Sequence, residues 1–151
     1  MARWAPGEAD IEAQVVAGDL QQLSGDAANG ERLLAKATVT LRTARSATAS
    51  DPDSAVVLAY DASRQALTAL LAQQGLRPTA KGGHYAVELA TRAQFGSGFR
   101  QFGALRRRRN ELEYPERPGD QAASDEASEA VERAQAIIAA AEGLLEQLGL
   151  F

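Results

Sequence analysis

The chain has 151 residues, which is long enough for one domain with its own core. Its formal net charge of −4 makes it too acidic to coat duplex nucleic acid. A local cationic patch can still hold one nucleic-acid segment. It contains no Cys and one His, which excludes a disulfide framework, a thiolate metal site and a His-rich metal site. No apolar run approaches the ~20 residues of a membrane span, and the N-terminus does not read as a signal peptide. We therefore expect a cytoplasmic protein with no membrane partner, metal or cofactor.

Ala and Leu dominate the composition, and aromatic residues are few. Ala and Leu are strong helix formers, so the composition favours an all-α fold. The first helical segment is expected over about residues 8–24, before the turn sequence "SGDAANG". The second is expected over about residues 31–49.

The third segment has the clearest helix signals. In "SDPDS", Asp51 or Asp53 can cap a helix that has Pro52 in its first turn. The helix is expected to run to about Gln74 and to end at Gly75, before the loop "GLRPTAKGG". An apolar stripe at helical spacing marks its core face. The stripe comprises Val56, Tyr60, Ser63, Leu67, Leu70, Leu71 and Gln74.

The fourth segment begins near Gly83 and is broken or kinked at "FGSGF" before a stretch that reaches about Tyr114. The last helix begins near Ser124 and ends near Gly149. No strand-like alternation is apparent. The pattern predicts one domain over residues 1–151, an antiparallel bundle of four main helices, with residues 1–25 as an extra N-terminal helix or extension.

The stretch "RRRRNELEYP", residues 106–115, sorts its side chains by angle when it is placed on a helix. The core face takes Phe102, Leu105 and Leu112. The flank beside that face takes Arg109, Glu113, Arg106, Asn110 and Tyr114, in that order. Arg107, Arg108 and Glu111 lie elsewhere. The pattern therefore predicts two arginines in a polar cluster and two that face solvent.

An Arg at the edge of a core face needs partners, because an unpaired buried charge is costly. Glu113 follows Arg109 by four residues and can form an ion pair with it, which gives a purely structural interpretation. Alternatively, Arg106 and Arg109 hold a phosphate, which the neighbouring amide and phenol help to position. Spacing alone does not separate the two interpretations.

Three stretches, "AYDASRQALTALLAQQGLRP", "GGHYAVELA" and "RRRRNELEYP", resemble parts of a HEPN domain, a helical bundle common in prokaryotic toxin–antitoxin and defence systems. The first is similar to the core helix of the family and the turn after it. The second is similar to the start of its next helix. The third occupies the place of the family hallmark, an Arg followed by a polar residue and then, four to six residues after the Arg, by a His. The resemblance covers about residues 30–148.

Residue by residue, Arg109 matches the hallmark Arg and Asn110 the polar residue, whereas Tyr114 stands where the family has His. In active members the motif implies a metal-independent ribonuclease whose two motifs face each other across a homodimer, where the RNA 2′-hydroxyl attacks the adjacent phosphate. Arg109 would stabilise the charge on that phosphate. A Tyr, with a reference pKa near ~10, is a poor base at neutral pH but can donate a hydrogen bond or a proton. In some relatives a Tyr near the motif accepts a nucleotide from a partner enzyme, so Tyr114 is also a candidate acceptor.

His84, the single His, is expected at the start of a helix, where the helix dipole favours the neutral imidazole. A neutral imidazole suits a general base, but a lone His more often caps a helix or packs, and His84 lies on a different helix from Arg109. Asp61 and Arg64 lie one turn apart on the third segment. We expect them to form a surface pair, although in a dimer they could face the same cleft as Arg109.

The sequence leaves three functions open. The first is a HEPN-type endoribonuclease or toxin, acting on RNA as a homodimer with a composite site at its interface and opposed by a cognate antitoxin. The second is a module without turnover that binds RNA or nucleotide through Arg106 and Arg109, near Glu113 and His84, or that is regulated by a nucleotidyltransferase. The third is a helical dimer in which the arginines have only a structural function. The resemblance favours the ribonuclease.

Overall fold

The computed structural model describes residues 2–151. Its helices are α1 (Glu8–Val16), α2 (Glu31–Ala47), α3 (Pro52–Gln73), α4 (Gly83–Phe95), α5 (Arg100–Glu113) and α6 (Ser124–Leu145). Two short strands, β1 (Leu20–Gln22) and β2 (Leu76–Pro78), and two 3₁₀ turns, η1 (Gly25–Ala27) and η2 (Gly96–Phe99), complete the order. The predicted all-α fold is confirmed.

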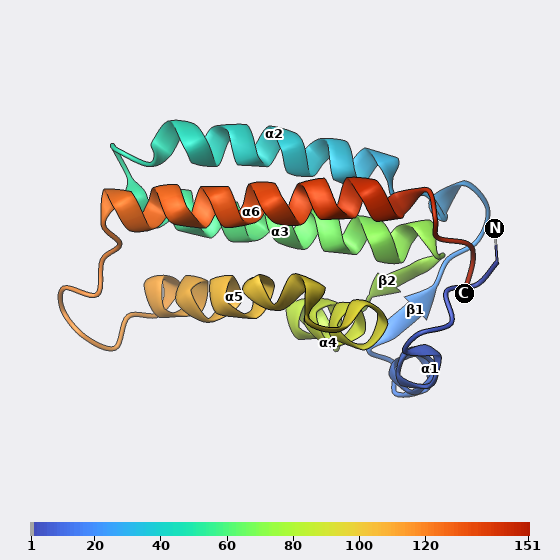
Figure 1. Ribbon diagram of the computed structural model, residues 1–151. Coiled ribbons are helices and arrows are strands. Elements are labelled where there is room, and N and C mark those ends of the chain that lie inside the picture. The colour runs from blue at the N-terminus through green and yellow to red at the C-terminus, as the bar shows by residue number, and fades with distance from the viewer. Residues whose placement is uncertain (1) are drawn as a thin grey trace.

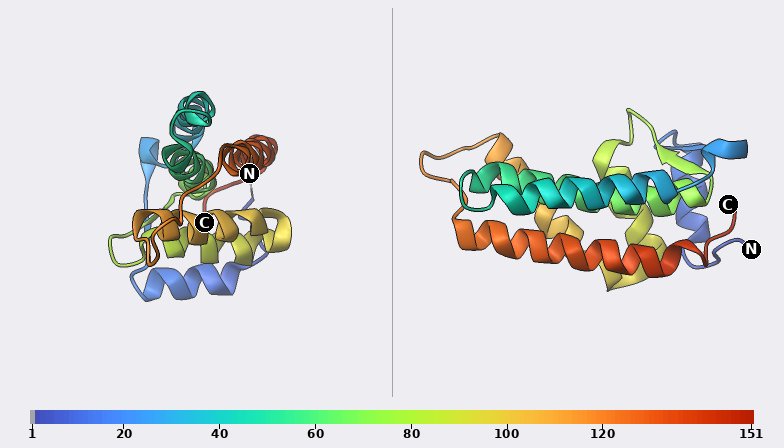
Figure 2. Two further views of the ribbon diagram at one scale, coloured as in Figure 1. Left: turned by 90° about the vertical axis from the view of Figure 1, so that its left-hand side faces the viewer. Right: turned by 90° about the horizontal axis from the view of Figure 1, so that it is seen from above.

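The long helices α2, α3 and α6 lie side by side, and α5 lies against them at an oblique angle (Figures 1 and 2). Helices α1 and α4 cross the direction of the long helices at one end, as the view along the long helices shows (Figure 2). Helix α3 occupies the centre because it packs against α2, α4, α5, α6 and β2. A helix with so many neighbours must be apolar on most of its surface.

The start of α3 confirms the predicted cap and selects one of the two Asp residues. The Asp51 side chain accepts a hydrogen bond from the backbone N–H of Ser54 at 3.2 Å, and Pro52 occupies the first turn. At the other end, Gly75 takes a left-handed φ of 74°, which glycine adopts without steric penalty. The predicted helix boundaries therefore match the structure closely here.

The N-terminal segment differs from its prediction. Helix α1 ends at Val16, well before residue 24, and Gly18 turns the chain with a φ of 80°. The following residues form β1, which pairs with β2 in antiparallel register, Leu20 opposite Pro78. Nothing in the sequence indicated these strands, because a three-residue pairing between distant segments is too short to produce a periodic pattern.

The fourth segment is broken, not kinked, at "FGSGF". Gly96 has a φ of 61°, and residues 96–99 form η2 between α4 and α5. The break lets α5 turn away from α4 and extend toward the other end of the bundle (Figure 1). Helix α6 ends at Leu145, one turn before the predicted Gly149.

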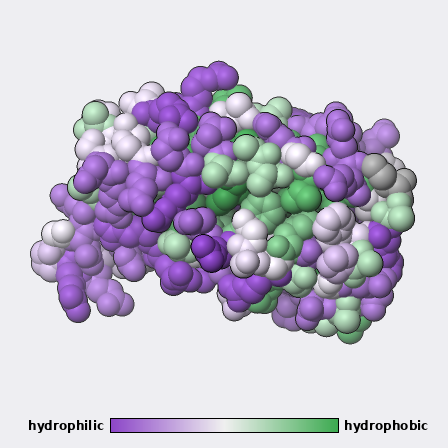
Figure 3. Space-filling view, viewed as in Figure 1, coloured by the Kyte–Doolittle hydropathy of each residue, from purple (hydrophilic) through white to green (hydrophobic). Residues whose placement is uncertain are grey.

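One face of the molecule divides by hydropathy. Hydrophilic residues gather over the end that carries the connection from α5 to α6, and more hydrophobic residues lie over the middle of the same face (Figure 3). Within residues 2–151, no helix is both long and apolar enough to cross a membrane.

Candidate functional site

Helices α3, α4 and α5 bring four chemically active side chains together, which we call the His84 cluster: Tyr60, Arg64, His84 and Arg109. The guanidinium carbon of Arg109 lies 6.0 Å from the ring centre of Tyr60. The rings of Tyr60 and His84 are 5.7 Å apart between centres. Arg64 and Arg109 are both close enough to His84 to shift its pKa. The sequence predicted His84 and Arg109 as site residues, but it did not place them together.

The local structure explains how these side chains meet. Tyr60 and Arg64 are one helical turn apart on α3, and His84 lies in the first turn of α4. The Tyr60 ring is fully buried and stacks on Phe102 of α5, with ring centres 5.2 Å apart. This stacking fixes α5 against α3, and Arg109 lies two turns further along α5 from Phe102.

The cluster contains donors that have no acceptor. Within residues 2–151, Tyr60 Oη, Arg64 Nε and Arg109 Nε are buried and make no hydrogen bond. Arg109 donates from Nη1 to Asn110 Oδ1 at 3.2 Å, and Arg64 lies 3.8 Å from Asp61. Because a buried polar group without a partner is costly, three such donors in one place mark the cluster as a candidate functional site.

The charges of the cluster set its protonation states. The pKa of His84 is lowered, first by partial burial and then by the positive charges of Arg64 and Arg109, against the opposing effect of Asp61. Burial raises the pKa of Tyr60 to about 12, despite the nearby arginines. At neutral pH the imidazole is therefore neutral and able to accept a proton, whereas the phenol stays protonated and able to donate a hydrogen bond.

Arg106 lies beside this cluster but is already paired. Its Nε donates to Glu88 Oε2 at 2.5 Å, and its guanidinium carbon lies 5.2 Å from the ring centre of Tyr85. Glu88 is only 4% exposed and also accepts from Arg92, at 3.0 Å. Sequence reasoning missed Glu88. Its spacing of four residues from both His84 and Arg92 was the only available signal.

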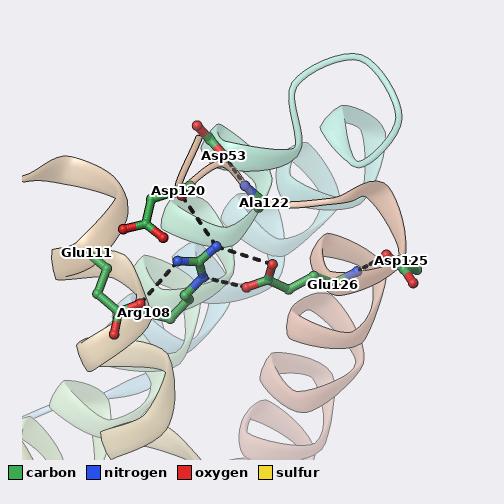
Figure 4. A network of polar contacts seen from close by, with 7 residues as sticks. All are labelled: Asp53, Arg108, Glu111, Asp120, Ala122, Asp125 and Glu126. Atoms are coloured by element: carbon green, nitrogen blue, oxygen red, sulfur yellow. Dashed lines mark hydrogen bonds and ion pairs between the residues drawn. The ribbon is translucent and has the colours of Figure 1, made fainter. Parts of the chain in front are cut away.

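Arg108 corrects the prediction that two arginines face solvent. It donates from Nε to Glu126 Oε1 at 2.5 Å and from Nη1 to Glu111 at 3.1 Å (Figure 4). It also reaches the backbone oxygen of Asp120 at 3.5 Å. These bonds, the Glu126 bond first, raise the pKa of Arg108. Arg108 therefore fastens α5 to α6, whereas Arg107 is exposed as predicted.

The predicted ion pair between Arg109 and Glu113 is absent from the part of the chain that the structure describes. Arg109 turns toward α3 and α4, while Glu113 lies at a separate hollow beside Asp53 and Leu112. The expected surface pair of Asp61 and Arg64 is present, but half-buried and next to the His84 cluster. A helical wheel gives the angle of a side chain and not the helix that it meets.

Tyr114 lies apart from the His84 cluster in the single chain. It follows the last residue of α5, its side chain is 73% exposed, and it lines an open cavity from which Arg109 is absent. Glu111, Glu116 and Asp120 line the same cavity. Three carboxylates outnumber the one arginine of the cavity, Arg117, and repel a phosphate, so this cavity by itself does not suit an RNA backbone.

Within residues 2–151 there is no group of three or more His, Cys, Asp or Glu side chains that could hold a metal ion. Arginines, a phenol and one imidazole are ligands for anions, and a guanidinium matches a phosphate in shape and charge.

Comparison with known proteins identifies the family. A family model described as the HEPN domain matches residues 31–144, from the start of α2 almost to the end of α6. No curated protein and no solved structure gives a significant match. The matched region contains α3, α4 and α5 and therefore the whole His84 cluster, and the chain belongs to the HEPN domain family.

Proposed function

We propose that this chain is a metal-independent endoribonuclease that acts as a homodimer, with Arg109 binding the scissile phosphate and His84 transferring the proton. One observation carries the proposal. A neutral imidazole lies beside two guanidinium groups whose buried Nε atoms have no acceptor within residues 2–151. Asn110 supports the arrangement because it accepts a hydrogen bond from Arg109 and so orients the guanidinium.

The chemistry needs no group beyond these side chains and the RNA. His84 accepts the proton of a ribose 2′-hydroxyl as the 2′ oxygen attacks the adjacent phosphorus. Arg109 and Arg64 stabilise the negative charge that develops on the non-bridging oxygens. The bond from phosphorus to the 5′ oxygen then breaks, and the imidazolium returns the proton to that oxygen. The products are a 2′,3′-cyclic phosphate and a 5′-hydroxyl.

This assignment gives His84 the function that the family hallmark gives to a His four to six residues after the Arg. Tyr114 occupies that position, but it is exposed, and the cavity that it lines has three carboxylates and one arginine. We therefore propose that Tyr114 is dispensable for cleavage. Glu113, which we predicted near the phosphate, lies at a different hollow and receives no function in this scheme.

A cleavage assay in the presence of a chelator tests the proposal. The substrates are single-stranded and structured RNA, and the variants are Arg109→Gln, His84→Gln and Tyr114→Phe. Arg42→Gln, at an exposed position of α2, is the control. We expect losses of ~10²-fold or more for the first two variants and nearly full activity for Tyr114→Phe and the control. No cleavage by a folded wild-type dimer would refute the nuclease, and loss of activity in Tyr114→Phe alone would move the proton transfer to Tyr114.

Because the chain has a single His, the binding of RNA can be followed through the imidazole NMR signal of His84 without measuring cleavage. A 2′-deoxy oligonucleotide has no attacking hydroxyl, so it binds without reaction. Its phosphate would neutralise the charge of Arg64 and Arg109, which now lower the pKa of His84. We expect the pKa of His84, followed by its one imidazole NMR signal, to rise when the oligonucleotide is added. An unchanged pKa under saturating oligonucleotide would place the phosphate elsewhere.

A second candidate function rests on the exposure of Tyr114. A phenol that is 73% exposed at the end of a helix is accessible to another enzyme, as a nucleotide acceptor must be. In this alternative the chain binds RNA or nucleotide without turnover and is regulated by a nucleotidyltransferase. Mass spectrometry of the chain from its native cells would then find a nucleotidyl group on Tyr114. A fully unmodified Tyr114 under conditions where RNA cleavage is also undetectable would argue against this function.

A further inference from the structure

A cavity of about 520 Å³ lies where α4, η2 and the start of α5 meet. Its volume falls in the range of ordinary small-molecule sites. The lining residues that matter for the argument are Glu88, Arg92, Ser97, Phe99, Arg100 and Arg107. The ribonuclease proposal above uses none of them.

The cavity is cationic in a chain whose net charge is −4. Three arginines line it against a single carboxylate, that of Glu88. Glu88 is bound to Arg92 and also to Arg106 outside the cavity. Within residues 2–151, Arg100 and Arg107 make no ion pair and no side-chain hydrogen bond. Two free guanidinium groups at one cavity are suited to a phosphate.

The cavity also has an apolar part. The side chain of Phe99 is buried apart from 6% of its surface, and Phe95 packs against it edge-on, with ring centres 5.6 Å apart. With so little of its surface exposed, Phe99 forms a rigid apolar part of the cavity wall, against which a nucleobase can pack. A phosphate and a base together define a nucleotide.

Glu88 connects the cavity with Arg106, which lies beside the His84 cluster. Glu88 lines the cavity and at the same time binds Arg106, whose guanidinium lies over the ring of Tyr85. His84, Glu88 and Arg92 follow one another at intervals of one turn along α4, which spans ~12 Å from His84 to Arg92. Tyr85 is 50% exposed beside this line. A single nucleic-acid strand along α4 would thus meet cations and an aromatic ring in succession.

We propose that this cavity is a nucleotide subsite, which holds a flanking nucleotide of a single-stranded RNA whose scissile phosphate lies at the His84 cluster. Arg100 and Arg107 bind the phosphate of that nucleotide, and Phe99 supports its base. Tyr85 stacks a base on the path between the two places. The inference rests on the proposed function only in taking the phosphate at the His84 cluster as the one that is cleaved. The binding of the strand to the cavity does not depend on cleavage.

The test is competition against a labelled 2′-deoxy hexanucleotide by unlabelled strands of two, four and six nucleotides and by free nucleoside monophosphates. The variant is Arg100→Gln/Arg107→Gln. The matched control is Arg32→Gln/Arg42→Gln, which removes the same charge from exposed positions of α2. Cleavage of a dinucleotide RNA is measured in parallel.

We expect the wild-type affinity to rise with strand length. The cavity variant should bind the hexanucleotide about tenfold more weakly and show a salt dependence smaller by ~0.7 in log–log slope, because one phosphate contact is lost. Dinucleotide cleavage should be unchanged, and the control should bind as the wild type does. Equal weakening in both double variants would refute the subsite in favour of net charge. Free monophosphates that bind as well as the hexanucleotide would overturn the RNA assignment, whereas length-dependent binding without any cleavage would retain the subsite and reject the nuclease.

Discussion

Two helical glycines offer a direct test of how the Glu88 carboxylate is held. Gly103 lies buried in α5 and Gly143 lies exposed in α6. A Cβ atom on Gly103 would come within 2.6 Å of Glu88 Oε1, closer than any ordinary contact, whereas a Cβ on Gly143 would meet nothing within 4 Å. The same substitution, Gly→Ala, should therefore have opposite effects at the two positions.

The magnitudes follow from helix propensity and from the bonds of Glu88. Ala is favoured over Gly in a helix interior by ~1 kcal/mol. Gly143→Ala should gain about 0.5–1 kcal/mol, since nothing opposes it. Gly103→Ala must displace a carboxylate that accepts from Arg106 and Arg92. Hydrogen bonds to charged groups contribute about 1.5–3 kcal/mol each, but Arg92 is 61% exposed and regains water. The net result should be a loss of about 1–3 kcal/mol.

Urea unfolding followed by far-ultraviolet circular dichroism measures both effects, with the midpoint rising for Gly143→Ala and falling for Gly103→Ala. The decisive control is the same substitution in a Glu88→Ala background. There the carboxylate is gone, so Gly103→Ala should become neutral or stabilising. A loss at Gly103 that persists without Glu88, or equal gains at both glycines, would refute the reasoning.

Three further predictions concern single contacts. Asp51→Ala should destabilise the chain because it removes the acceptor for the Ser54 hydroxyl and backbone N–H. These two hydrogen bonds lower the pKa of Asp51. The difference in thermal unfolding midpoint between wild type and variant should therefore be smaller at pH 3 than at pH 7. Arg108→Gln should lower the free energy of unfolding by about 1 kcal/mol and speed amide hydrogen exchange at the start of α6, where its partner Glu126 lies. Unchanged exchange would show that the ion pair between Arg108 and Glu126 does not stabilise the start of α6. The folded pKa of His84 lies below its ordinary 6.5, so stability should fall as the pH drops below that value, and His84→Gln should flatten this part of the stability profile.

The sequence predicted best where the determinants are local. The start of α3 depends on Asp51 and Pro52, which act within one turn, and both lie where they were predicted. The apolar stripe of α3 predicted a core helix, and Tyr60 and Leu67 are fully buried. Three short stretches, among them the motif around Arg109, suggested the family that the family model then identified.

The sequence predicted least where a side chain meets another element. Arg106 and Arg108 were assigned by their angle around α5, but their partners, Glu88 and Glu126, are each 18 residues away on other helices. The ion pair expected from i, i+4 spacing, Arg109 with Glu113, lost to the contact of Arg109 with α3. Local spacing allows such a pair, and tertiary packing decides whether it forms.

The departure of this chain from the family hallmark acquires a physical meaning in the fold. The chemistry of the hallmark requires a neutral base close to a guanidinium, and nothing in that requirement specifies that both lie on one helix. In the proposed mechanism the imidazole comes from the first turn of α4, where partial burial, the arginines of α3 and α5 and the helix dipole all disfavour its protonated form. Tyr114, at the end of α5, shares its cavity with three carboxylates, one arginine and Asn110. A search for the linear motif alone would class this chain as inactive. Because His84 lies close to Arg109, the proposed nuclease activity should instead be tested by comparing RNA cleavage by the wild type and by His84→Gln.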